Sequence, residues 1–315
     1  MRGNAVASRP TDADTRLPPV DVAIVDIGAN TARLLVASVS DAGEIVQLRR
    51  ERRYLRLGDD VHRLGHIGPK KLAEAGEVAR RYARIARRSG VERFETIVTA
   101  PGRQAANGED LVRVLADETN APVVVLSGED EGRLAWEGAV ARMTDPPEVV
   151  AVADLGGGSC ELAVGTPALG PAWVRSLDLG ALRVTREYLG GENPPSRKRV
   201  AHARDEIREL LAIFEPPRPD TSLVVGGTAR AVGRIVGKRF GAAELDDLTA
   251  TLTRERAEKV TASHGVTAER AHTLLGGAHV LDELARRLGT DLEVGRGGLR
   301  EGAAHSLARH RAAVA

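Results

Sequence analysis

Two glycine-bearing turns, 128 residues apart, share one pattern of acidic and hydroxyl residues. The first lies in IVDIGANTARLLVA, residues 24–37, and the second in VADLGGGSCELAVG, residues 152–165. When they are aligned on Asp26 and Asp154, each turn has a hydroxyl residue five positions later and is flanked by two apolar, strand-forming runs. The offset is far longer than the period of a solenoid repeat. We therefore predict two duplicated domains, each opening with a strand, a turn and a second strand.

Length and composition fit two soluble domains and argue against several functional classes. The 315 residues exceed the usual size of a single core. A net charge of +1, from 45 basic and 44 acidic residues, argues against a protein that coats nucleic acid through its overall charge. Cys160 is the only cysteine, so neither an intrachain disulfide nor a paired-cysteine metal site can form. Without an apolar leader or a run of about 18 apolar residues, we expect no membrane span and a cytoplasmic protein.

The predicted elements repeat in the two halves of the chain. Residues 1–18 are polar and are expected to form a disordered tail. In the first domain, residues 19–143, we expect three strands, a helix over 70–89, a strand over 94–100, a helix over 108–119, a buried strand over 121–128 and a helix over 129–143. In the second domain, residues 144–315, we expect three strands, a helix over 196–214, a strand and helix over 222–236, and a final strand and helix.

The glycines of the second turn favour an anion-binding site. Gly156, Gly157 and Gly158 can adopt positive φ angles and present successive N–H groups to a phosphate. Asp154 and Glu161, on either side of them, can hold a divalent cation through oxygen ligands. A plain hairpin turn would also explain the glycines. The matched turn in the other half favours a shared cleft between domains, which is a common place for a small ligand.

Three further segments carry candidate site residues. A third glycine turn, VVGGTARAVG, places Gly227 before a helix whose N-terminus favours anions, although a tight corner is an equal alternative. In SGEDEGR, one of Glu129, Asp130 and Glu131 can face the cleft and align or deprotonate water, or the three acids can simply stabilise a helix N-terminus. Arg103 in TAPGRQAAN can bind phosphate oxygens with its fork or lie in solvent.

Other nucleotide and metal motifs are not found in the sequence. GGGSCE lacks the last glycine of G-x-G-x-x-G, and GRIVGKR has the wrong spacing for a P-loop. His62 and His66 are four residues apart, but Gly65 and Gly68 weaken the helix that would bring them together. We therefore expect no zinc site there.

Three basic clusters, residues 49–56, 80–88 and 196–204, are most simply explained as solvated faces of strands and helices. A cluster that borders the cleft would instead offer a track for a polyanion. The cluster over 196–204, at the start of a helix in the second domain, is our preferred candidate.

Seven motifs in order resemble the exopolyphosphatase and guanosine pentaphosphate phosphohydrolase family, the Ppx/GppA phosphatases. They run from about residue 20 to residue 307 and are DIGANTARLLV, TAPGRQAAN, SGEDEGRLAWEG, DLGGGSCEL, SLDLGALRVTREYL, VVGGTARAV and GGLREG. The resemblance implies the short, two-domain form of this family: two ribonuclease-H-like domains of the actin, sugar-kinase and heat-shock superfold, with an active cleft between them. It also implies a homodimer and a last helix, about residues 300–313, that returns to the first domain.

The resemblance implies roles for individual residues. Glu131 is the implied base or water-orienting group, and Arg103 is implied to hold the terminal phosphoryl group. Asp154 and Glu161 are the implied ligands of Mg²⁺, or of Mn²⁺ in its place. The complete set of candidate phosphate-binding residues is Asp26, Gly28, Asn30, Thr31, Arg33, Gly156, Gly157, Gly158, Ser159, Gly227 and Thr228.

We therefore expect an enzyme that hydrolyses the terminal phosphate of inorganic polyphosphate and releases orthophosphate. Phosphoryl transfer needs mainly positioning and charge neutralisation, which these residue types provide. The closest alternative is hydrolysis of the 5′ γ-phosphate of guanosine pentaphosphate, although three Phe, three Tyr and two Trp offer few platforms for a guanine. A kinase of the same superfold and a catalytically silent polyphosphate-binding protein are further alternatives. We expect neither nucleic acid nor a membrane as a partner.

Overall fold

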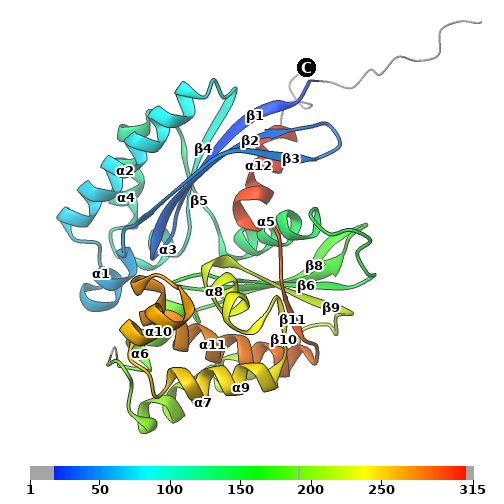
Figure 1. Cartoon of the computed structure of the whole chain (residues 1–315). Coiled ribbons are helices and arrows are strands. Elements are labelled where there is room, and N and C mark those ends of the chain that lie inside the picture. The colour runs from blue at the N-terminus through cyan, green and yellow to red at the C-terminus, as the bar shows by residue number, and fades with distance from the viewer. Residues whose placement is uncertain (1–17, 191, 310–315) are drawn as a thin grey trace, which may run out of the picture.

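The computed structural model describes residues 18–190 and 192–309, which form two α/β domains, one above the other in Figure 1. Apart from its last residue, the segment predicted to be a disordered tail lies outside the described residues. Among the described residues, no helix is long and apolar enough to cross a membrane.

The first domain is built on a five-stranded sheet of order β3-β2-β1-β4-β5. The first three strands form an antiparallel meander, and the other two run parallel to the first strand. The strands are β1 (Val20–Ile27), β2 (Thr31–Val39), β3 (Ile45–Tyr54), β4 (Arg93–Val98) and β5 (Val123–Val125). The helices are α1 (Leu57–Leu64), α2 (Pro69–Arg88), α3 (Ala100–Gln104), α4 (Gly108–Thr119) and α5 (Gly128–Val140).

The second domain repeats this plan on a six-stranded sheet of order β10-β11-β9-β6-β7-β8. Its strands are β6 (Val150–Leu155), β7 (Cys160–Thr166), β8 (Gly170–Leu177), β9 (Thr221–Val225), β10 (Arg239–Phe240) and β11 (Leu292–Val294). The helices that follow β8 are α6 (Ala181–Glu187), α7 (Arg197–Ala212), α8 (Gly226–Val236), α9 (Ala242–Leu252), α10 (Ala257–His264), α11 (Ala268–Leu288) and α12 (Leu299–Arg309). The shared strand order confirms the predicted α/β class with two ribonuclease-H-like sheets.

Helices α2 and α4 cover one face of the first sheet, and α5 and α12 cover the other. The buried stripe of α2 consists mainly of small residues, with Ala75, Ala79 and Ala86 at helical spacing. The last helix, α12, leaves the second domain and packs Leu299 and Ala303 into the apolar cluster of the first sheet. Its N-terminus consequently lies at the junction of the two domains (Figure 1).

Helices α5 and α12 approach each other closely because glycines face each other across their crossing. A methyl group added at Gly302 would overlap the backbone oxygen of Leu134, and one added at Gly138 would overlap the backbone of Gly298. Helix α5 also packs Trp136 against the strands of the second sheet. The two helices therefore lie between the sheets and connect both domains to the pocket described below.

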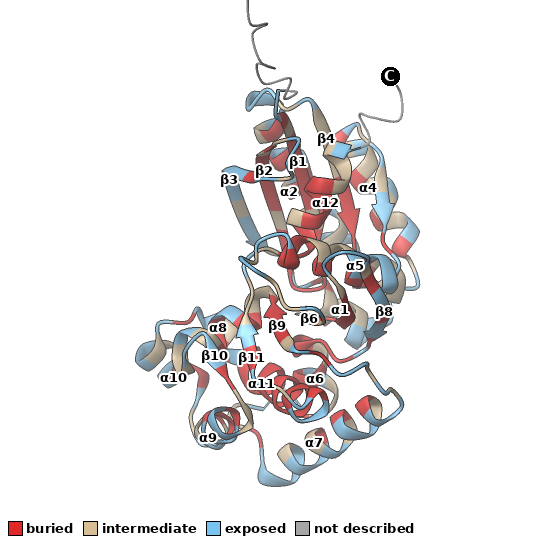
Figure 2. Ribbon diagram, turned by 90° about the vertical axis from the view of Figure 1, so that its right-hand side faces the viewer, coloured by how far each residue is buried: buried red, intermediate tan, exposed pale blue. Residues whose placement is uncertain are grey.

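The structure differs from the prediction in several segments, since the short helices α1, α3 and α6 were not predicted, and two further differences are larger. The segment over 121–128, expected to be a buried strand, contributes only the short edge strand β5, where Val124 and Val125 are 40% and 39% exposed. That expectation was wrong because β5 pairs only with β4 and so has no neighbour on its other side. The second segment contains α9, α10 and α11, for which no helix was predicted. Helix α11 is buried almost all round (Figure 2).

Candidate active site

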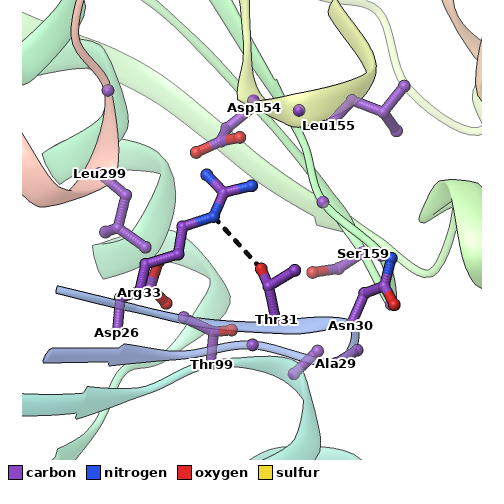
Figure 3. A pocket seen from close by; sticks show the side chains of 18 of the residues that line it. Asp26, Ala29, Asn30, Thr31, Arg33, Thr99, Asp154, Leu155, Ser159 and Leu299 are labelled. Carbon is purple, nitrogen blue, oxygen red and sulfur yellow. Dashed lines mark hydrogen bonds between the residues drawn. The ribbon is translucent and has the colours of Figure 1, made fainter. Parts of the chain in front are cut away.

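A pocket lies between the two domains at the ends of β1 and β6 (Figure 3). The two matched turns, which connect β1 to β2 and β6 to β7, contact each other here. A methyl group added at Gly157 would lie 3.1 Å from Cβ of Asn30, and one added at Gly158 would lie 3.2 Å from Cβ of Ala29. The loops predicted to share a cleft therefore form opposite walls of one pocket.

Both turns close with the same hydrogen bond. The amide of Gly28 donates to the carbonyl of Thr31, and the amide of Gly156 donates to the carbonyl of Ser159, each at 3.0 Å. Among the described residues, the glycines with positive φ do not include those of the two turns, so the expected positive-φ nest is wrong. The turn instead leaves little room for side chains: a methyl group added at Gly158 would lie 2.9 Å from Cβ of Ala100. The neighbouring Gly180 is needed because a methyl group there would overlap the carbonyl of Gly157.

Four amides of the facing turns have no backbone acceptor. In the described part of the chain, the N–H groups of Ala29, Asn30, Gly157 and Gly158 donate to no backbone carbonyl, and all four residues line the pocket. Unpaired amides converging from two loops are a typical cradle for phosphate oxygens. The N-terminus of α8, which begins at Gly226 without a side-chain cap, also lines the pocket and favours an anion.

The pairing of the strands determines which charged residues lie opposite each other beside the turns. Asp26 lies directly opposite Arg33, and Asp154 lies directly opposite Glu161. Directly opposed residues share one face of their sheet. In Figure 3 the Arg33 guanidinium points into the pocket between Thr31, to which its Nε donates at 3.2 Å, and the Asp154 carboxylate. Burial lowers the pKa of Arg33 to about 9.

The acidic residue predicted as the base is held by an arginine. Nη1 of Arg103 donates to Oε2 of Glu131 at 2.9 Å and to the carbonyl of Leu126 at 2.8 Å. Nη2 of the same guanidinium lies 3.6 Å from Oε1 of Glu161. Burial, with a contribution from Glu161, raises the pKa of Glu131 well above its usual range. Glu131 is therefore a stronger base than an exposed glutamate.

The carboxylates of Asp154 and Glu161 fit a hard divalent cation. Glu161 is 1% exposed, and its Oε2 has no hydrogen-bond partner among the described residues. Burial raises its pKa to about 7, and the adjacent Asp154 contributes to this rise. The described residues contain no cluster of three or more His, Cys, Asp or Glu side chains. A site with two carboxylates still suits Mg²⁺, which keeps several waters and uses one or two carboxylates together with substrate phosphates.

Most of the predicted site residues meet in the pocket. Those that line it are Asp26, Gly28, Asn30, Thr31, Arg33, Glu131, Asp154, Gly156, Gly157, Gly158, Ser159 and Gly227. Arg103, Glu161 and Thr228 lie behind this lining. The guanidinium of Arg103 forms ion pairs with Glu131 and Glu161. It therefore binds carboxylates in this structure, whereas the prediction had it bind a phosphoryl group.

The residue-by-residue prediction missed three arginines that line the pocket: Arg230 of α8, Arg270 of α11 and Arg300 of α12. Arg300 is 7% exposed, and its Nε lies 3.8 Å from Oδ2 of Asp26. It belongs to the motif GGLREG, which was the one available sequence signal. Arg230 follows the predicted glycine turn by three residues, whereas nothing in the local sequence marked Arg270.

The chain was compared with known proteins. Residues 35–310 match the model of the Ppx/GppA phosphatase family. Exopolyphosphatase 1 of Mycobacterium tuberculosis is 30% identical over 303 residues, covering 89% of this chain and 86% of the relative. The crystal structure of the Aquifex aeolicus member of the Ppx/GppA protein family is 25% identical, with a TM-score of 0.80 over 93% of this chain and 99% of that one. An exopolyphosphatase structure from Cytophaga hutchinsonii, 18% identical, shares the fold with a TM-score of 0.82 over 92% of this chain and 98% of that one.

Proposed function

Because the chain belongs to the Ppx/GppA phosphatase family, and is thus a hydrolase of the phosphatase type, we propose that it is an exopolyphosphatase. It removes the terminal phosphate of inorganic polyphosphate as orthophosphate. The observation that carries this proposal is the set of unpaired amides of Ala29, Asn30, Gly157 and Gly158, which converge on one pocket from both domains. Such a cradle suits a phosphoryl group whose charge is spread over equatorial oxygens.

Glu131 activates the attacking water in this proposal. The water oxygen attacks the terminal phosphorus, a water proton passes to the Glu131 carboxylate, and the bridging P–O bond breaks. The bond's electrons remain on the oxygen of the shortened chain. The hydrogen bond from Arg103 fixes the Glu131 carboxylate, so Arg103 acts as a positioning residue.

The charges of the pocket neutralise the two sides of the breaking bond. The amides of the turns bind the equatorial oxygens, while Arg33 and Arg230 lie on the pocket wall and stabilise the leaving phosphate. Asp154 and Glu161 would hold a Mg²⁺ ion, or Mn²⁺ in its place, which when bound would supply further charge neutralisation of phosphate oxygens.

A panel of substrates tests the proposal. Phosphate release from tripolyphosphate, long-chain polyphosphate, guanosine pentaphosphate and ATP is measured side by side with Mg²⁺. We expect the largest kcat/KM on polyphosphate and no transfer of labelled phosphate from ATP to anything but water. A higher kcat/KM on guanosine pentaphosphate than on every polyphosphate would replace the proposed substrate, and tight polyphosphate binding without release would make the protein a binding protein.

A further inference from the structure

The edge strand β3 places two of its arginines beside the pocket. Arg52 lies directly opposite Arg33 of β2, which itself lies opposite Asp26 of β1. The three side chains therefore form a row on one face of the sheet, and Arg52 extends this row to the edge. Arg50, two residues earlier, lies on the same face opposite Leu35. Figure 2 shows β3 as an exposed strand at the edge of the domain.

Two arginines of the second domain face this row. Arg230 and Arg270 both line the pocket. Nη1 of Arg270 donates to Oγ1 of Thr228 at 2.9 Å. A methyl group added at Gly227 would overlap Nη2 of Arg270 and would lie 3.2 Å from Nη2 of Arg33. The guanidinium groups of Arg270 and Arg33 therefore meet at this glycine, where the two domains adjoin.

The positive charges on the two sides are close enough to act on each other. Burial lowers the pKa of Arg230 to about 10, and Arg50 is among the cations that lower it further. Burial also lowers the pKa of Arg270, and Arg52 adds to this effect. Among the described residues, none of these four arginines forms an ion pair with a carboxylate, and Arg52 stacks instead on the ring of Tyr54 at 5.1 Å. The carboxylates of Asp154 and Glu301 act on Arg230 with the opposite sign. Like charges gathered without ion-paired carboxylates favour the binding of an anion.

The cluster over 196–204, our preferred track from the sequence, is not part of this arrangement. It lies on α7, which packs against α11 on the side of the second domain remote from the first (Figure 1). Its Arg204 is engaged by carboxylates, 3.9 Å from Oδ1 of Asp246 and 3.8 Å from Oδ2 of Asp282. The expectation that this cluster borders the pocket was therefore wrong. A run of basic residues in the sequence does not show which side of the domain it will occupy.

We propose that Arg50 and Arg52 of β3, together with Arg230 and Arg270, form a track that binds the polyphosphate chain beyond its terminal phosphate. The chain then leaves the pocket over the β3 edge of the first sheet. This inference rests on the proposed exopolyphosphatase function. An extended strand spaces side chains on one face by about 6.6 to 6.8 Å, which suits a linear polymer with charge on every unit. Guanidinium forks match phosphate oxygens at each step.

The test compares two double variants of the same strand. Arg50→Ser with Arg52→Ser removes the track, and Arg49→Ser with Arg53→Ser removes the same charge from the opposite face of β3. For the track variant we expect kcat/KM on long-chain polyphosphate to fall by about tenfold or more through KM, with a log–log salt dependence shallower by about 1 to 2. On tripolyphosphate, which we expect to end at the pocket, where Arg230 and Arg270 lie, and before Arg50 and Arg52, its kcat/KM should stay within about twofold of the unsubstituted protein.

The outcomes separate this inference from the proposed function. If both double variants lose long-chain activity equally, or if only Lys198→Ser with Arg199→Ser on α7 loses it, the track is overturned while the exopolyphosphatase activity stands. If the unsubstituted protein releases no phosphate from any polyphosphate, the proposed function fails. Titration calorimetry with long-chain polyphosphate then still tests the track: weaker binding in the Arg50/Arg52 variant alone supports it, and unchanged binding overturns it.

Discussion

At the scale of single residues, the proposed chemistry depends most directly on Glu131. Replacing it by glutamine keeps its size and leaves a group that cannot accept the water proton. We expect Glu131→Gln to lower kcat on polyphosphate by about 10² to 10⁴-fold, the usual contribution of a general base. Binding of tripolyphosphate, measured by titration calorimetry, should persist, because the amides of the two turns are unchanged.

Glu129→Gln provides the matched control, since it makes the same change on an exposed residue of the same helix turn. Its turnover should equal that of the unsubstituted protein. Unchanged turnover in Glu131→Gln would remove Glu131 from the mechanism.

Asp26 and Asp154, which precede the two turns, allow a second comparison, that of the Mg²⁺ requirement of two matched variants. Asp154 lies opposite Glu161, whereas Asp26 lies opposite Arg33. We expect Asp154→Asn to raise the Mg²⁺ concentration for half-maximal activity by about tenfold or more, because one of the two proposed carboxylate ligands is lost. Asp26→Asn should lower activity without that shift in Mg²⁺ requirement. Equal shifts in both variants would mean that the metal is not held by the second turn in particular.

His279 is a titratable group in the core of the second domain. It is 2% exposed, and both of its ring nitrogens lack hydrogen-bond partners among the described residues. Burial, reinforced by the charge of Arg204, lowers its pKa to about 4. A histidine with a depressed folded pKa stabilises the protein above its unfolded pKa of about 6.5, and this stability is lost as the pH falls toward about 4.

We therefore expect the thermal midpoint to fall between pH 6.5 and pH 4 by an amount that His279→Leu reduces. The stabilisation at stake is roughly 3 kcal/mol over the whole window. Differential scanning calorimetry at pH 5 and pH 7.5 measures about 2 kcal/mol of it, with the exposed His202→Leu as the control. If the two variants and the unsubstituted protein share one pH profile, His279 does not titrate in this way.

The site was only partly predictable from residues near each other in the sequence. Each turn carried its own acid, glycine and hydroxyl, so Asp26 and Asp154 could be recognised without a fold. Arg230 and Arg270 reach the pocket only because α8 and α11 bring together distant parts of the chain. The role of Arg103 was equally hidden, since its partners Glu131 and Glu161 belong to different domains.

At the scale of elements, helices with a clear apolar stripe in the sequence were predicted, and a helix without one was missed. Helix α4 was predicted over the range observed because its apolar residues repeat along one face and it begins with acids. Helix α11 was missed because it is buried on all sides and carries His279, Asp282 and Glu283 among its buried residues, which breaks the apolar stripe. Packing against α6, α7 and α9, rather than an amphipathic pattern, stabilises it.

The crossing of α5 and α12 makes a prediction at this scale. Gly302 has no space for a side chain against the backbone of Leu134. Gly302→Val should therefore push the helices apart, cost about 1 to 3 kcal/mol of stability and shift Arg300 away from Asp26. We expect a thermal midpoint lower by several degrees and a fall in kcat.

Arg309→Val is the control for this crossing, because it places the same side chain at the exposed end of α12. Its thermal midpoint and kcat should remain close to those of the unsubstituted protein. A Gly302→Val protein with an unchanged midpoint would show that the helices can accommodate a side chain at their crossing.

At the scale of the whole molecule, the pocket is a joint between two domains. Direct contacts cross it: Gln104 donates to Asp178 at 2.6 Å, and Arg186 donates to Asp59 at 2.9 Å. Exposed contacts of this kind contribute little each. A ligand bound to the amides of both turns couples the two domains much more strongly. Its binding stabilises the folded state by RT ln(1 + [L]/Kd), or about 2.7 kcal/mol at a hundredfold excess over Kd.

This linkage predicts how the two domains unfold. Calorimetry on Glu131→Gln, which should bind tripolyphosphate without consuming it, separates the effect of the ligand from turnover. With tripolyphosphate and Mg²⁺ we expect one transition at a higher temperature, because neither domain can unfold without releasing the ligand. Chloride at the same ionic strength should leave the unliganded profile unchanged. If tripolyphosphate raises the midpoint of only one domain while the other unfolds as before, the phosphate is held by a single turn, and the facing pair of loops is not a shared site.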